Sequence, residues 1–184
     1  MAGQLNGAKN SISPKYPNFS FHHFDVKDQL HNPSGSKTMA DYRLPLEDDS
    51  IDLVILWPVF THMFHEDIVY YLKEFQRVMK RSGKVMASVF IYDDEVLDSA
   101  RATNLTPYSL RFEYAFGDGC LINDPKHPAG AVAYTSDALS RMAVEGGLEI
   151  HRIHLGSWSG LHKNGYVQDM IILKRARWLE SFYS

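Results

Sequence analysis

The residues best placed for chemistry follow a short apolar strand, at Trp57-Pro58-Val59-Phe60-Thr61-His62. In doubly wound α/β folds, ligands bind outside the carboxyl ends of the strands, so we expect a ligand beside this segment. Trp57 and Phe60 can stack on a flat ring, although apolar packing under the next helix is an equally good interpretation. The ordinary pKa of histidine would suit His62 to general-base chemistry, but a solvent-facing position at the helix start is the simpler interpretation.

Metal chemistry is not expected from the histidines. His62 and His65 are three positions apart, as ligand pairs on a helix are, but no third ligand follows at a suitable spacing. His22 and His23 are adjacent, and adjacent residues of a strand point to opposite faces. The single Cys120 excludes an internal disulfide and a cysteine-rich site. The sequence therefore predicts no metal centre.

A strand–helix–strand unit must position the segment that begins at Trp57. Ile51–Leu56 is a short apolar run, as in a strand buried on both faces. Over His65–Lys80 apolar side chains recur at helical spacing, which predicts an amphipathic helix. Ser82-Gly83 should end this helix, and Val85–Ile91 is a second apolar strand. Such a unit has parallel strands joined by a right-handed crossover.

Two stretches of this unit resemble class I S-adenosylmethionine-dependent methyltransferases. They are LPLEDDSIDLVILWPVFTHM at 44–63 and EFQRVMKRSGKVMASVF at 74–90. The family shows a proline-plus-acidic turn, an "FD-V" strand, a helix ending "RVLKPGG" and an apolar strand. Ile51-Asp52 and Lys80-Arg81-Ser82-Gly83 match the second and third of these features. The resemblance extends from about Ser11 to Arg175 and implies a Rossmann-like α/β sheet.

The resemblance also implies that the sheet is truncated. Phe19–Val26 resembles the family's third strand, which a glycine-rich loop for the methionine part of the cofactor should precede. No G-x-G loop stands there, because Gly3 and Gly7 lie in a polar stretch. The resemblance therefore implies a sheet without its first two strands and their helices. It further implies weak or absent binding of S-adenosylmethionine by this chain.

The family's site residues are carried over by position. Asp25 matches an acidic position that contacts the adenine edge, and Val26 would pack beside it; capping of a strand end is the alternative for Asp25. The implied cofactor-binding set is completed by Trp57, Pro58 and Phe60. The implied acceptor-binding set is His62, Tyr92, Tyr114 and Trp158. No catalytic residue is identified.

The rest of the chain should add a cover and a hairpin. We expect a short helix over Glu95–Ala102 and an extra strand over Leu110–Phe116. In the resembling enzymes this region covers the acceptor site. The alternative is a solvated flap that packs its aromatic residues on the core. Thr135–Glu145 is predicted to be a capped helix. Strands over Leu148–Leu155, with a bulge between Ile150 and Ile153, and over Asp169–Lys174 should pair antiparallel at one sheet edge.

Composition limits the possible classes. The 184 residues suit one domain, which we place at 16–184 after a flexible tail at 1–15, and Trp178–Ser184 is a short apolar tail. A net charge of −3 gives no electrostatic attraction to nucleic acid or anionic membrane. No apolar run reaches membrane-spanning length and the N-terminus lacks a signal-peptide core. A cytoplasmic protein is expected.

Two functions remain open. One is an enzyme, or an incomplete or inactive form of one, that moves a methyl group to a small molecule by in-line displacement. The other is a non-enzymatic binding or oligomerising module. Without the first two strands, Ile51–Leu56 would present a bare edge that another chain could pair with. We expect a homodimer with Phe19–Val26 at or beside the interface; direct pairing of Phe19–Val26 with Ile51–Leu56 is the alternative.

Overall fold

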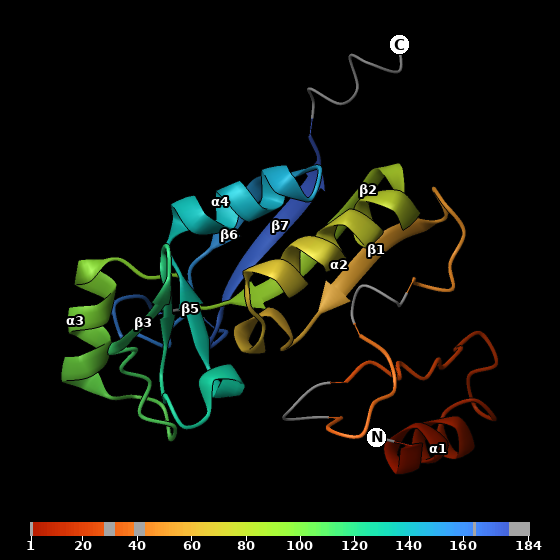
Figure 1. Ribbon diagram of the computed structural model, residues 1–184, viewed down its shortest axis with the longest axis horizontal. Coiled ribbons are helices and arrows are strands. Elements are labelled where there is room, and N and C mark those ends of the chain that lie inside the picture. Colours follow the sequence, from red (N-terminus) through yellow and green to blue (C-terminus); the bar gives the residue numbers. More distant parts are fainter. Residues whose placement is uncertain (1, 28–31, 39–42, 164, 177–184) are drawn as a thin grey trace. The chain divides into compact units, whose positions relative to one another are not determined.

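A computed structural model describes residues 2–27, 32–38, 43–163 and 165–176 of the chain (Figure 1). The chain divides into two compact units, Met1–Arg43 and Leu44–Ser184. The division predicted from the sequence, a tail at 1–15 and one domain at 16–184, stays a prediction. The predicted tail at Trp178–Ser184 lies outside the described residues.

The first unit contains helix α1 (Ala2–Ser11) and a long irregular segment. The prediction of a strand over Phe19–Val26 is wrong, because only Val26 forms a bridge, with Lys37. A turn brings these two residues together, and Asn32 Nδ2 donates to the Val26 carbonyl oxygen at 2.9 Å. The alternation of aromatic residues that suggested the strand instead places the Phe19 and Phe21 rings against each other, 6.4 Å apart. The flexibility expected of residues 1–15 stays a prediction.

The second unit is built on a four-stranded sheet in the order β1-β2-β7-β6. Its strands are β1 (Ile51–Leu56), β2 (Met79–Val89), β7 (Asp169–Arg175) and β6 (Leu148–His154). β1 and β2 are parallel and are joined by helix α2 (His65–Val78), as the sequence predicted. β7 pairs antiparallel with both β2 and β6. The predicted mixed α/β sheet with an antiparallel hairpin at its edge is therefore confirmed.

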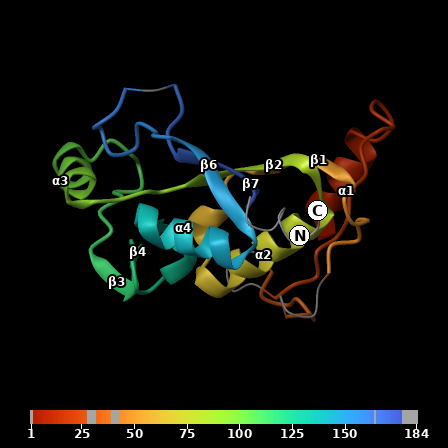
Figure 2. The same cartoon turned by 90° about the horizontal axis from the view of Figure 1, so that it is seen from above.

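Helices α2 and α4 (Ser136–Glu145) lie on the same side of this sheet (Figure 2). The core forms where their apolar faces meet the strands, and includes Ile68, Leu72, Leu139, Met142, Val85 and Leu173. The prediction that β1 is buried on both faces is wrong. Leu53 and Ile55 point away from this core and are 52% and 57% exposed. Alternate residues of a strand face opposite sides, so covering one face leaves the other in solvent.

The junction between α2 and β2 is tighter than the sequence suggested. The helix ends at Val78 and β2 begins at Met79, before Ser82-Gly83. The β1–β2 register shifts here, from Ile51 opposite Met79 to Leu53 opposite Lys84. A Cβ on Gly83 would stand 2.5 Å from Met79 Cγ and 2.9 Å from the Ile51 carbonyl oxygen. Glycine therefore permits the close approach of the two strands at this bulge.

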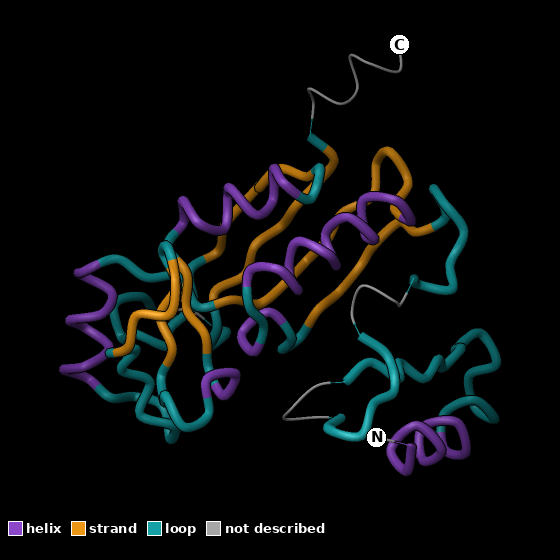
Figure 3. The backbone as a smooth tube through the Cα atoms, viewed as in Figure 1, coloured by secondary structure: helices purple, strands orange, loops and turns teal. Residues whose placement is uncertain are grey.

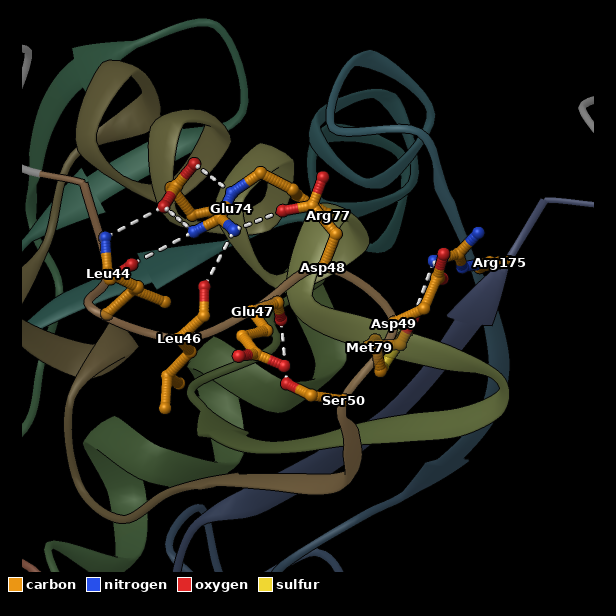
Figure 4. A network of polar contacts seen from close by, with 10 residues as sticks. All are labelled: Leu44, Leu46, Glu47, Asp48, Asp49, Ser50, Glu74, Arg77, Met79 and Arg175. Atoms are coloured by element: carbon orange, nitrogen blue, oxygen red, sulfur yellow. Dashed lines mark hydrogen bonds and ion pairs between the residues drawn. The ribbon is translucent and has the colours of Figure 1, made fainter.

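The acidic turn before β1 is held by Arg77 of α2 (Figure 4). Its guanidinium donates to both carboxylate oxygens of Glu74, at 3.0 and 2.8 Å, and to Asp48 at 2.6 Å. It also donates to the carbonyl oxygens of Leu44 and Leu46, at 3.0 and 2.9 Å. The hydrogen bonds to Glu74, reinforced by Asp48, raise the pKa of Arg77. One side chain thus sets the path by which the turn enters β1.

An inserted region follows β2. It contains α3 (Asp94–Thr103) and a separate antiparallel sheet, β3-β4-β5 (Figure 3). The short strands are β3 (Tyr114–Gly117), β4 (Cys120–Ile122) and β5 (Val132–Tyr134), with 3₁₀ turn η3 (Pro128–Gly130) before the last. The extra strand predicted over Leu110–Phe116 exists only from Tyr114. Phe112 adopts a positive φ of 47° and is fully buried, which interrupts the extended run.

The last elements agree with the sequence. Thr135 caps α4 by accepting a hydrogen bond from the Ala138 amide at 3.2 Å. The predicted bulge in β6 appears as a register shift between Ile150 and Arg152. Among the residues that the structure describes, no helix is long and apolar enough to span a membrane.

Candidate functional site

The segment after β1 is a short loop that contains the 3₁₀ turn η2 (Phe60–His62). Trp57 is 49% exposed and Pro58 is also exposed. Phe60 and Thr61 turn inward and are almost completely buried. The ring of Phe60 belongs to the core, as expected if it packs under the following helix rather than against a ligand. Trp57 is the large ring that this loop offers to solvent.

Two hydrogen bonds fasten this loop to the inserted region. His62 Nδ1 is 3.0 Å from the carbonyl oxygen of Ala129, in η3, and donates to it. Tyr134 Oη donates to the carbonyl oxygen of Met63 at 3.0 Å. The general-base role considered for His62 stays a prediction, but one of its ring nitrogens already has a structural partner.

A cavity of about 490 Å³ lies next to this joint. It is bounded by the start of α2, the β3–β4 hairpin, β5 and the first turns of α4. Phe64 and Phe116 stack at its wall with ring centroids 4.5 Å apart. Tyr134, Cys120 and Ala138 are its buried lining residues. The remaining lining residues are His65, Glu66, Asp67, Gly117, Asp118 and Arg141.

Three of the side chains that line the cavity are carboxylates, those of Glu66, Asp67 and Asp118. Arg141 donates to Asp118 at 2.7 Å, and His65 lies 3.0 Å from Glu145. Burial raises the pKa of the Cys120 thiol. Burial, reinforced by Cys120 and by the charge of Asp67, raises the pKa of Tyr134. Both groups are therefore protonated and uncharged near neutral pH. The carboxylates give the cavity a negative electrostatic character.

The predicted acceptor residues lie in different places. Tyr92 is partly buried, its amide donates to the Tyr134 carbonyl oxygen at 3.0 Å, and burial raises its pKa. Tyr114 lies on β3, opposite Ile122, and is exposed. Trp158 is buried and packs edge-on against Phe90. Trp158 belongs to a second core cluster with Phe90 and Phe112, and the Tyr92 side chain packs against this cluster, whereas His62 lies at the joint between the loop after β1 and the inserted region.

A buried carboxylate anchors that second cluster. Asp169 accepts hydrogen bonds from the amides of Ile91 and Gly156, both at 2.7 Å, and from Trp158 Nε1 at 2.8 Å. Burial raises the pKa of Asp169, although the three donors oppose this shift. The carboxylate therefore joins the end of β2, the loop after β6 and the start of β7.

Asp25 and Val26, the other predicted cofactor contacts, belong to the first unit. Asp25 accepts a hydrogen bond from the Ser36 hydroxyl, which lowers the pKa of Asp25. Val26 is buried within its own turn. The residues that the structure describes contain no group of three or more metal-ligating side chains.

The loop after β1 does not by itself fit S-adenosylmethionine. Phe60 and Thr61 turn into the core, which leaves Trp57 and Pro58 at the strand end. No glycine stands in this loop to let its amides approach a ligand. Sequence reasoning missed the residues that do surround a cavity, above all Phe64, Phe116 and Tyr134.

The class of fold is a mixed α/β sheet of the Rossmann-like methyltransferase type. The crystal structure of the PH0226 protein from Pyrococcus horikoshii OT3 superimposes on this chain with a TM-score of 0.52 and a sequence identity of 14%. The match covers 96% of this chain and 68% of that protein. A mitomycin 7-O-methyltransferase is 16% identical over 70% of this chain and 31% of its own, with a TM-score of 0.46. A SAH-bound methyltransferase in calicheamicin biosynthesis is 14% identical over 71% and 32%, with a TM-score of 0.45.

A family model described as a methyltransferase domain matches residues 26–87. The predicted resemblance to methyltransferases is therefore confirmed over these residues, about a third of the chain. The chain spans about a third of the length of the mitomycin and calicheamicin enzymes.

Proposed function

We propose that this chain is a methyltransferase-like module that binds a small molecule and, taken alone, does not transfer a methyl group. The observation that carries the proposal is the cavity of about 490 Å³. It lies where the inserted sheet is fastened to the loop after β1. Its volume is in the usual range for small-molecule sites, roughly 300–1,000 Å³.

The position of the cavity supports an acceptor role. Its lining begins at Phe64, in the connection that leads from the carboxyl end of β1 to α2, and ligands of doubly wound folds bind beside such connections. The inserted region closes over it through the His62 and Tyr134 hydrogen bonds. The chain would thus keep the acceptor side of the fold and bind S-adenosylmethionine weakly or not at all.

A library of one- and two-ring compounds, screened by amide chemical shifts of the labelled chain, tests this proposal. We expect ligands to shift resonances of Phe116–Cys120 and Glu66. Phe116→Ala should weaken these ligands at least about fivefold, or roughly 1 kcal/mol. Tyr108→Ala, which removes an exposed ring outside the cavity, is the control. A screen without any shift at the cavity would contradict the proposal.

The second candidate is an oligomerising module, supported by the exposed apolar face of β1. Leu53, Ile55 and Trp57 alternate along one side of this edge strand and are all about half exposed. Exposed apolar patches and open strand edges favour association. We propose a homodimer through this edge. A cytoplasmic location is also proposed, because the free, buried thiol of Cys120 is compatible with a reducing compartment.

A further inference from the structure

We propose that the cavity between α2, the β3–β4 hairpin and α4 binds a small organic cation, an aryl-alkyl amine. The inference rests on the proposed function and names the class of ligand for the same cavity. It begins with the rings. Phe64 and Phe116 stack with an interplanar angle of 27°, yet Phe116 remains 49% exposed. A half-exposed ring pair beside a cavity offers an apolar surface that a flat ligand would cover.

The aromatic pair also favours positive charge. The face of an aromatic ring is negative, so ammonium groups are attracted to it when they lie within about 6 Å of the ring centre. Tyr134 is a further aromatic residue in the lining, and its hydroxyl hydrogen is already donated to the Met63 carbonyl oxygen. Its burial keeps this phenol neutral, because the pKa of Tyr134 is raised. The rings therefore act as neutral, electron-rich walls.

The carboxylates determine the sign of the charge. Glu66, Asp67 and Asp118 line the cavity, and Arg141 pairs with Asp118 at 2.7 Å. Glu66 and Asp67 stand in the first turn of α2, whose positive end they offset. Carboxylates thus outnumber permanent cations around the cavity. An anion would meet these carboxylates, whereas an ammonium group can donate hydrogen bonds to them.

The volume limits the ligand to small molecules. A cavity of about 490 Å³ holds a one-ring compound with a short chain and does not hold a folded partner. Its lining divides into two kinds of group, the ring pair of Phe64 and Phe116 and the carboxylates of Glu66, Asp67 and Asp118. A ligand with an apolar ring at one end and an amine at the other matches this division.

Three probes that share a phenylethyl group and differ in charge test the inference on the intact chain. They are 2-phenylethylamine, 2-phenylethanol and 3-phenylpropionate, measured by amide chemical-shift titration at low salt. We expect the amine to bind at least about tenfold more tightly than either other probe. Its affinity should fall about three- to tenfold in Glu66→Gln, with the cavity resonances shifted in both proteins.

The matched control is Glu95→Gln. Glu95 occupies the first turn of α3, is exposed and lies outside the cavity, so the variant tests loss of a helix-start carboxylate alone. We expect it to leave the affinity for the amine unchanged. Two results would overturn the preference for a cation and leave the proposed function standing. One is equal affinity for the amine and the alcohol, and the other is a loss of affinity in Glu95→Gln as large as in Glu66→Gln. If none of the three probes binds, this inference is overturned. The proposed function is contradicted only if no compound of the wider library shifts the cavity resonances either.

Discussion

The carboxylate of Asp169 shows how one residue can organise a region without any chemistry of its own. Its oxygens accept from three donors that come from two segments, Ile91 after β2 and the Gly156–Trp158 loop after β6, at distances of 2.7–2.8 Å. The donors are two backbone amides and the indole of Trp158. Because all of them are buried, none can turn to water if the acceptor is lost. Trp158 is therefore held by Asp169 in the second core cluster, against Phe90 and Phe112.

We predict that Asp169→Asn lowers the free energy of unfolding by about 1–3 kcal/mol. The amide nitrogen of asparagine cannot accept a hydrogen bond, so at least one buried donor would lose its partner. Chemical denaturation followed by tryptophan fluorescence measures the change. Asp98→Asn, at an exposed position of α3, should change stability by less than about 0.5 kcal/mol. Equal stability of the two variants would contradict the role assigned to Asp169.

At the scale of the elements, hydrogen bonds join the turn before β1 to helix α2. Arg77 ties the carbonyl oxygens of Leu44 and Leu46 to α2, and Glu74 accepts from the Leu44 amide at 2.8 Å. The Asp49 and Ser50 amides also donate to the carbonyl oxygens of Arg77 and Val78, at 3.1 and 2.8 Å. These contacts fix where β1 begins, and hence where its carboxyl end places Trp57.

We predict that Arg77→Lys destabilises the chain by about 1–3 kcal/mol and speeds hydrogen exchange of the Leu44 amide. A lysine cannot bind both oxygens of Glu74 while reaching the two carbonyl oxygens, because it lacks the planar fork of arginine. Denaturation and exchange measured by NMR test this. Arg141→Lys makes the same exchange in a single, exposed ion pair and should cost less than about 1 kcal/mol. Unchanged exchange at Leu44 in Arg77→Lys would contradict the assigned role.

The elements that could be predicted are those whose partners are near in sequence. The β1–α2–β2 unit and the β6–β7 hairpin follow from local periodicity, and Thr135 and the β6 bulge from local signals. Phe19–Val26 has a strand-like alternation, but a strand also requires a neighbour, and only Lys37 pairs with it. Periodicity does not carry that information.

The cavity could not be predicted for a related reason. Its walls come from Phe64, Phe116 and Arg141, which are far apart in the sequence, and none of them carries a local motif. The positive φ of Phe112 sets where β3 begins and so which rings face the cavity. The sequence pointed instead to the segment at the end of β1, and neither Trp57 nor His62 lines the cavity. It could not predict that an inserted sheet would be fastened there by Tyr134.

On the scale of the whole molecule, we predict a homodimer that depends on the exposed side of β1. Ile55→Lys should yield a monomer in light scattering, because it places a charge in an apolar contact. Val144→Lys is the matched control, since Val144 is 52% exposed on α4, on the other side of the sheet. It should leave the dimer intact. A wild-type chain that remains monomeric at high micromolar concentration would contradict the proposed dimer.

The central proposal is that this chain, which has a methyltransferase-type fold and a small-molecule cavity, binds S-adenosylmethionine weakly or not at all. Isothermal titration of the purified 184-residue chain with S-adenosylmethionine tests it most directly. Each missing buried polar contact costs about 1–3 kcal/mol, and several such losses remove most of a micromolar affinity. We predict no saturable binding tighter than about ten micromolar, in a sample whose amide spectrum shows a folded chain. A dissociation constant at or below about ten micromolar would contradict the account.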